Sequence, residues 1–120
     1  MTPGEEMSQT FDPSSEYLYM VRSALADGKY EMEWNHWYDY EHLPRIAATP
    51  GFISGTRYIQ WPPTGRNNSY LTIYEVSGPA ALTSEEYRHL PGWGKWRPVI
   101  TGWHRGLYQL IANLEDRDRK

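Results

Sequence analysis

The chain has 120 residues, a formal net charge of −3 and a pI near 5.8. This length suits one domain with a modest core, and the interspersed acidic and basic residues offer no basic surface for nucleic acid or anionic lipid. The absence of cysteine excludes disulfides, zinc–thiolate sites, iron–sulfur clusters and a thiol nucleophile. No apolar run approaches the roughly 20 residues of a membrane span, so we expect a soluble cytoplasmic protein without a membrane partner.

The two ends of the chain differ from its centre. Residues 1–14 are polar, interrupted by Pro and Gly and without hydrophobic periodicity, so we predict a flexible leader. Residues 115–120 are predicted to form a similar tail. A single domain is therefore expected over residues 15–114, and its six Trp and ten Tyr suit pocket linings and subunit interfaces.

The first half of this domain is predicted to run strand, helix, strand. Residues 17–22 form a short β-prone run that is apolar on both faces until its last position. A helix is expected from about 29 to 43, because Asp27 can cap its start and Pro44 can end its regular part. Residues 52–61 are rich in β-branched and aromatic side chains and follow a Pro-Gly turn, which indicates a second strand.

The second half is predicted to run strand, irregular helical crossover, strand. Residues 69–76 form a third strand that pairs with the second, residues 80–103 hold short helical pieces, and residues 105–113 form a fourth strand. The order β-α-β-β-α-β is the plan of the ferredoxin-like fold, an α+β fold with a four-stranded antiparallel sheet and helices on one face. Because no element remains to cover the other face, we expect the sheets of two chains to pack together in a homodimer.

The predicted helix carries the residues best suited to chemistry. Asn35, Tyr38, Asp39 and His42 are spaced three and four apart and share one face, and Trp34 lies beside them. An imidazole near a phenol and a carboxylate suits a general base, with Asp39 orienting His42. The alternative is a histidine that only hydrogen-bonds a carbonyl at the helix end.

A metal site on this helix is poorly supported by the sequence. His36, Asp39 and His42 would have to converge, but His36 and His42 are six residues apart and diverge around a helix. We therefore expect no metal.

Other candidate substrate-binding residues come from the strands and the crossover. Arg22 could hold a carboxylate or enolate oxygen, although a surface arginine is the simpler interpretation, and Arg57 carries the same ambiguity. Tyr58 and Trp61 could line a cavity, as could Tyr19 and Tyr74, although core or dimer packing explains each equally well. Trp103, with Trp93, Trp96 and His104, falls where a lid would be expected.

The stretch Trp37–Pro44, followed by Thr49–Phe52 and Arg57–Tyr58, resembles the motif of the EthD-like branch of the dimeric α+β barrel proteins. In that motif an aromatic-rich helix ends in a His-hydrophobe-Pro step, and Pro-Gly opens the second strand. The resemblance spans residues 17 to 114. It implies a dimeric α+β barrel with a pocket between helices and sheet in each subunit, and only His42 matches the motif's polar centre with any force.

Members of this superfamily include cofactor-free isomerases, lactone and polyketide cyclases, quinol-forming monooxygenases and haem-handling enzymes. We predict a cofactor-independent isomerase, cyclase or lyase that moves a proton on an aromatic or polyketide-like molecule, with His42 as base and Tyr38 or Tyr58 as donor to the oxyanion. One alternative is an oxygenase, either cofactor-free or haem-dependent with His42 as axial ligand. The other is a barrel that binds a ligand without catalysis.

Overall fold

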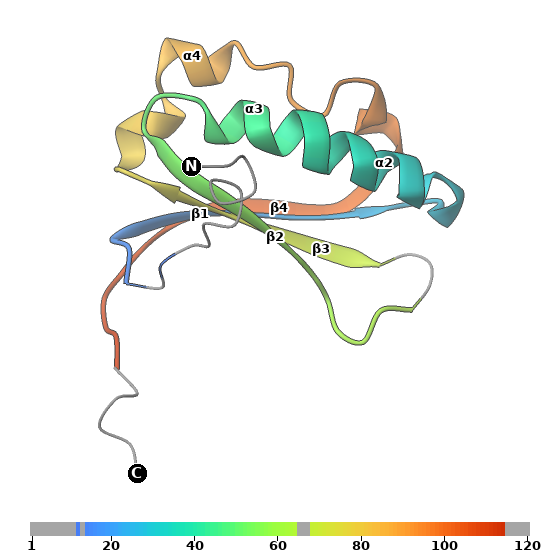
Figure 1. Ribbon diagram of the computed structural model, residues 1–120, viewed down its shortest axis with the longest axis horizontal. Helices are drawn as coiled ribbons and strands as arrows, with labels where there is room; N and C mark the ends of the chain where they lie inside the picture. The colour runs from blue at the N-terminus through green and yellow to red at the C-terminus, as the bar shows by residue number, and fades with distance from the viewer. Residues whose placement is uncertain (1–11, 13, 65–67, 115–120) are drawn as a thin grey trace, which may run out of the picture.

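The computed structural model describes residues 12, 14–64 and 68–114. This part of the chain forms two layers, a four-stranded sheet and a set of helical segments that all cover one face of it (Figure 1). Apart from positions 12 and 14, the predicted leader and tail lie outside the described residues. None of the described helices combines the length and the hydropathy needed to cross a membrane.

The sheet is antiparallel throughout, with the strand order β2-β3-β1-β4. Its strands are β1 (Tyr17–Leu25), β2 (Phe52–Ile59), β3 (Ser69–Val76) and β4 (Ile100–Gln109). The predicted pairing of β2 with β3 is confirmed, and so is the α+β fold with a four-stranded antiparallel sheet.

Strand β4 begins at Ile100, whereas the sequence pattern predicted a start at Arg105. The pairing of β4 with β1 shifts between the Arg22–His104 and Ala24–Thr101 pairs, next to Gly102, whose φ is +57°. Glycine adopts this left-handed conformation without the penalty that a side chain would bring, so the strand can bulge and resume its pairing. As a result Trp103 lies within β4 and not in the crossover.

The helical layer begins as predicted but continues past its predicted end. A 3-10 turn, η1 (Gly28–Tyr30), starts at Asp27, whose side chain accepts a hydrogen bond from Lys29 N at 3.0 Å. It is followed by α2 (Glu31–Trp37), the π-helical turn η2 (Tyr38–His42) and α3 (Leu43–Ala47).

The prediction that Pro44 ends the helix was wrong. Leu43 N–H donates to Tyr38 O, five residues back, so the usual four-residue hydrogen-bond ladder is already interrupted one residue before Pro44. Proline has no backbone N–H to donate. Pro44 lies in the first turn of α3, where a backbone N–H would have no acceptor within the helix in any case. The π turn thus lets the helix accommodate the proline and run on to Ala47.

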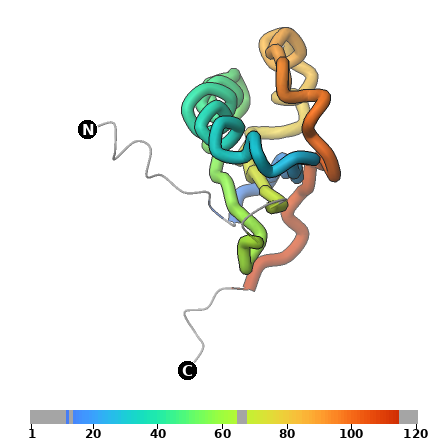
Figure 2. Tube along the Cα trace, turned by 90° about the vertical axis from the view of Figure 1, so that its right-hand side faces the viewer, coloured from blue at the N-terminus to red at the C-terminus, as the bar shows by residue number. Residues whose placement is uncertain are grey.

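The crossover from β3 to β4 is irregular, as predicted. It contains η3 (Pro79–Leu82), α4 (Glu85–Arg88) and η4 (Gly94–Val99). Figure 2 shows this crossover beside the α2–α3 segment, above the same face of the sheet. The helical layer therefore has two halves, and both contribute to the space between them and the sheet.

The two faces of the sheet are used differently. On the helix-facing side, alternate residues such as Tyr19, Val21 and Tyr74 are buried in the core. The opposite side, which we call the open face, is covered by none of the described helical segments (Figure 1). Tyr58 and Tyr108 lie on it by strand register and are 42 % and 49 % exposed.

Candidate functional site

A cavity of about 370 Å³ lies between the sheet and both halves of the helical layer. Tyr38, His42 and Tyr74 form its buried side, while the side chains from the crossover and β4 that face solvent form its other side. This volume falls in the lower part of the range of roughly 300–1,000 Å³ found for small-molecule pockets. The cavity is large enough for an organic ligand of a few fused rings.

The π turn places His42 at the buried side of the cavity. Its ring stacks on Trp37, with centroids 4.7 Å apart and planes at 17°, and meets the edge of Tyr38 at 4.7 Å. The contacts of the His42 ring with described residues are with aromatic rings, and none of them is a hydrogen bond to a carbonyl at the helix end. Burial, followed by the charges of Arg45 and Arg57, lowers the pKa of His42 to about 4. The imidazole is therefore neutral near pH 7 and can accept a proton or a hydrogen bond.

Two phenols accompany His42. Thr72 Oγ1 donates to the Tyr38 hydroxyl at 3.0 Å, which leaves the phenolic proton of Tyr38 available for another acceptor. The buried Tyr74 hydroxyl makes no hydrogen bond of ordinary length to any described residue. Burial raises the pKa of Tyr38 and raises that of Tyr74 further. Both side chains are thus neutral donors beside a neutral imidazole.

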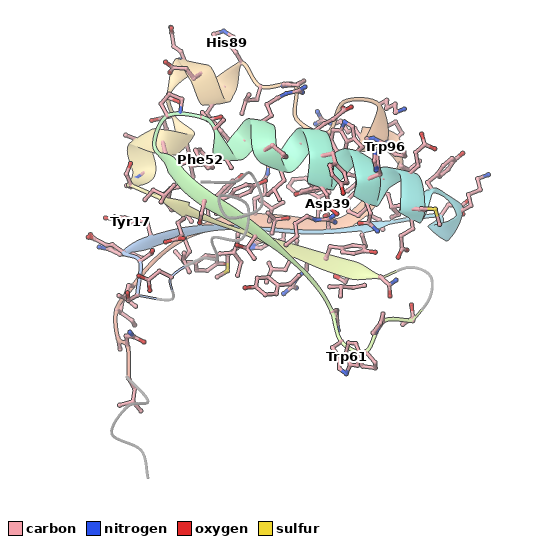
Figure 3. All side chains as sticks on the ribbon, viewed as in Figure 1. Tyr17, Asp39, Phe52, Trp61, His89 and Trp96 are labelled. Carbon is pink, nitrogen blue, oxygen red and sulfur yellow. The ribbon has the colours of Figure 1, made fainter. Side chains whose placement is uncertain are left out.

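Asp39 does not face His42, contrary to the predicted stripe. It is exposed, and its Oδ1 accepts a hydrogen bond from Arg57 Nη1 at 2.7 Å; Figure 3 shows it between the helical segment and β2. Each residue of a π turn advances by a smaller angle than in an α-helix, so residues three apart diverge further around the axis. Asp39 is therefore turned away from the cavity and orients Arg57, not His42.

Arg57 supports the cavity wall from behind. Its guanidinium lies 4.1 Å from the ring centroid of Tyr38, 5.1 Å from that of Trp34 and 4.8 Å from that of Tyr70. This cation is fixed among three rings and stabilises the position of Tyr38.

Trp34 and Asn35 lie behind the cavity as well. Trp34 is fully buried and packs its ring against Tyr38 and Tyr70. Asn35 Nδ2 donates to the Tyr70 hydroxyl at 2.9 Å. Neither residue lines the cavity. Trp34 packs directly on Tyr38, whereas Asn35 contacts Tyr70.

Three predicted substrate-binding residues lie elsewhere. Arg22 and Tyr58 line a separate shallow depression on the open face of the sheet, because their strand positions alternate with the helix-facing ones. Trp61 follows β2, is 81 % exposed and points away from the helices (Figure 3). The strand pattern does not distinguish the two faces when both carry aromatic residues.

Trp103 does line the cavity, and so do three arginines that the sequence pattern did not indicate as a group. Arg105 is two residues from Trp103 on β4 and so shares its face, which strand alternation could have revealed. Arg88 and Arg97 lie in the short helical pieces of the crossover, where there is no periodicity from which to infer a direction.

The residues considered for a metal site face different surroundings. His36 is exposed and its ring contacts Tyr40 at 4.7 Å, Asp39 pairs with Arg57, and His42 is buried. Within the described ranges, no three His, Cys, Asp or Glu side chains gather closely enough to hold a metal ion.

The α+β fold with its four-stranded antiparallel sheet matches that of solved structures of the dimeric α+β barrel type. No protein-family model and no curated protein sequence matches this chain. Solved structures of the same fold do match it, at identities below 20 %. At such identities the likeness establishes the fold, and the resemblance to the EthD-like branch in particular is not tested by it.

Three solved structures illustrate the likeness. SnoaB, a cofactor-independent oxygenase from Streptomyces nogalater, is 19 % identical with a TM-score of 0.63, covering 84 % of this chain and 98 % of its own. The ActVA-Orf6 monooxygenase of Streptomyces coelicolor, in complex with Nanaomycin D, is 12 % identical with a TM-score of 0.61, covering 87 % and 95 %. MhuD, a haem degrader from Mycobacterium tuberculosis with two haems in its active site, is 12 % identical with a TM-score of 0.54, covering 82 % and 99 %.

These neighbours contradict the predicted reaction class. Two are named as oxygenases and the third as a haem degrader, and none of the three as an isomerase, cyclase or lyase. The prediction of an enzyme that only moves a proton was therefore wrong, and the oxygenase alternative is the better supported one.

Proposed function

We propose that the protein is a cofactor-independent oxygenase that oxidises a hydroxylated, fused-ring aromatic molecule with dioxygen. One observation carries this proposal: a neutral imidazole, His42, and two neutral phenols, Tyr38 and Tyr74, share the buried side of an aromatic-walled cavity. The oxygenase names of the structural neighbours support the same reaction class.

His42 would begin the reaction by accepting the hydroxyl proton of the substrate. Because burial keeps this imidazole neutral, it is ready to act as a base near pH 7. The resulting aryloxide is electron-rich enough to react with dioxygen, and the Tyr38 proton can stabilise its oxygen without competing as an acid.

The overall reaction uses one dioxygen per substrate. A ring carbon that carries two hydrogens, or its enol equivalent, loses both hydrogens and gains one oxygen atom as a carbonyl. The second oxygen atom leaves with the two hydrogens as water, after His42 has returned its proton. Four electrons pass from the substrate to dioxygen, so no other reductant is needed.

The size of the cavity supports a ligand of two or three rings over a haem macrocycle. At about 370 Å³ the space is near the lower limit of small-molecule pockets, and we assign no step to haem. Haemin added to the purified protein should leave the Soret band of free haemin unshifted, and a shift lost in His42→Gln would favour the haem-dependent alternative.

We also propose the family branch, the oligomeric state and the compartment of the protein. The helix motif from Trp37 to Pro44 supports membership of the EthD-like branch, and the exposed tyrosines of the open face support a homodimer. The absence of cysteine supports a reducing compartment such as the cytoplasm.

The test uses 1,8-dihydroxyanthrone, whose enol is a hydroxylated three-ring aromatic. With ¹⁸O₂ we expect 1,8-dihydroxyanthraquinone carrying one labelled oxygen, labelled water as the second product, and a rate above that of buffer alone. His42→Gln should lower kcat/KM by roughly a hundredfold or more, because general-base catalysis contributes about 10²–10⁴-fold.

His36→Gln is the matched control, because His36 lies on the same helical segment but is exposed outside the cavity. It should retain the native rate, and circular dichroism should show that both variants are folded. Equal rates for native protein and folded His42→Gln would refute His42 as the base, and a rate no higher than buffer would count against the oxygenase itself.

A further inference from the structure

The solvent-facing side of the cavity is lined by three arginines from three separate elements. Arg88 ends α4, Arg97 lies in η4 and Arg105 lies in the middle of β4. All three are exposed, whereas the base and the phenols of the site are buried. The cavity thus has a neutral inner end and a cationic outer end.

Within the described part of the chain, this positive charge has no acidic counterpart. No described Asp or Glu lines the cavity, and the ion pairs among the described residues involve Lys29, Arg57 and Lys95 instead. Arg105 lies over the Trp103 ring, with its guanidinium carbon 5.2 Å from the ring centroid. The protein as a whole carries a net charge of −3, so the accumulation of three cations around one cavity is a local feature.

Three like charges without an acidic partner repel one another, and an anion between them would relieve this repulsion. Arginine is well suited to that role, because its planar guanidinium can donate two parallel hydrogen bonds to a carboxylate. An aromatic wall beside the arginines, from Trp93 and Trp103, suits a ligand whose anionic group is attached to a ring.

We infer that the ligand of this cavity is an aromatic acid, whose carboxylate binds Arg88, Arg97 and Arg105 while its ring hydroxyl lies at the opposite, buried end. This orientation rests on the proposed function, which places the reacting hydroxyl beside His42 and Tyr38. The arginines then determine which substrates enter and in which direction.

The test compares an acid with its own ester. The probe 6-hydroxy-2-naphthoate carries its hydroxyl and its carboxylate at opposite ends of two fused rings, and methyl 6-hydroxy-2-naphthoate has the same shape without the charge. Binding is followed by quenching of tryptophan fluorescence, to which Trp93 and Trp103 in the cavity wall contribute. We expect the acid to bind about tenfold to a hundredfold more tightly than the ester, and the difference to shrink as salt is raised.

The isomer 1-hydroxy-2-naphthoate tests the orientation. Its hydroxyl and carboxylate are adjacent, so it cannot reach the buried phenols and the arginines together. We expect it to bind more weakly than the 6-hydroxy acid. Equal binding of the two isomers would overturn the inferred orientation.

The arginines are tested by Arg88→Gln, Arg97→Gln and Arg105→Gln. Each should weaken binding of the acid by about tenfold and leave binding of the ester unchanged, because only the acid presents a charge to them. Lys29→Gln is the control: it removes one positive charge from an exposed side chain outside the cavity and should affect neither ligand.

Two results would overturn the inference: equal affinity of the native protein for acid and ester, or equal losses in Lys29→Gln and the arginine variants. Because binding of these naphthoates needs no turnover, the result is independent of the oxygenase assay. Preferential binding of the acid without oxidation of the anthrone would refute the proposed reaction and retain the aromatic acid as ligand. Oxidation of the anthrone without preferential binding of the acid would retain the proposed reaction and refute the aromatic acid as ligand.

Discussion

Burial keeps the imidazole of His42 neutral at pH values where an exposed histidine would be protonated. The pKa of the folded state, about 4, lies below the ordinary value of 6.5, so the unfolded chain takes up this proton first as the pH falls. The contribution of His42 to stability is therefore complete above about pH 6.5 and is lost between pH 6.5 and pH 4. The full loss amounts to about 3 kcal/mol.

This predicts a specific difference between variants in urea unfolding. The native protein should lose about 3 kcal/mol more of its unfolding free energy between pH 7.5 and pH 4 than His42→Gln does. The His36→Gln variant should behave like the native protein, since His36 is exposed. Parallel pH profiles for native protein and His42→Gln would show that the pKa of His42 is not lowered by folding.

At the scale of the elements, the close contact between α3 and the sheet depends on Gly55, which has no side chain. A Cβ at Gly55 would lie 2.8 Å from Leu43 Cδ1 and 3.0 Å from the Tyr74 ring. Gly55 in β2 thus allows the helix to approach the sheet closely at the point where Tyr74 lines the cavity.

Gly55→Ala is therefore expected to cost about 1–3 kcal/mol of unfolding free energy, because Leu43 or Tyr74 must move. By displacing Tyr74 it should also weaken binding of 6-hydroxy-2-naphthoate. Gly78→Ala is the matched control, since Gly78 has extended backbone and no heavy atom within 4 Å of an added Cβ. Urea unfolding and fluorescence titration of both variants test the prediction, which fails if the two behave alike.

The order and type of these elements could be predicted because hydrophobic pattern and turn residues are local signals. Strand β3 was predicted with its observed bounds, and the cap at Asp27 was found from its residue type. The bulge at Gly102 could not be predicted, because it depends on the pairing of β4 with β1. The π turn could not be predicted either, because a change from four-residue to five-residue hydrogen bonds leaves no mark in the hydrophobic pattern.

For the candidate site, too, some residues could be predicted from local sequence and others could not. Tyr38, His42 and Trp103 were predicted at positions that line the cavity. Asp39 was misplaced because the π turn rotates it away, and Arg22 and Tyr58 because a strand pattern does not say which face a helix will cover. Arg88 and Arg97 were missed because they depend on the path of an irregular crossover.

At the scale of the whole molecule, the open face of the sheet is the feature that a second chain would cover. A native mass of twice 14.1 kDa is expected from light scattering. The double variant Tyr58→Asp, Tyr108→Asp should be monomeric, because each chain of the dimer would have to bury two charges between the sheets.

Tyr40→Asp is the control for this prediction, since Tyr40 is 67 % exposed on the helical segment. It should leave the mass unchanged. A monomeric native protein would contradict the homodimer. A dimeric double variant would show that the interface lies on another surface.

The pairing of β1 with β4 has one more consequence. Tyr17 is the register partner of Gln109, and Leu110 N donates to Glu16 O at 2.7 Å, so the first and last strands bring the two ends of the domain together. A short linker could join them, and new termini could be opened in the β2–β3 loop, where Trp61 points away from the helices (Figure 3). We expect such a circular permutant to fold and to bind 6-hydroxy-2-naphthoate as the native chain does, because the cavity depends on which elements are neighbours and not on the order in which the chain connects them.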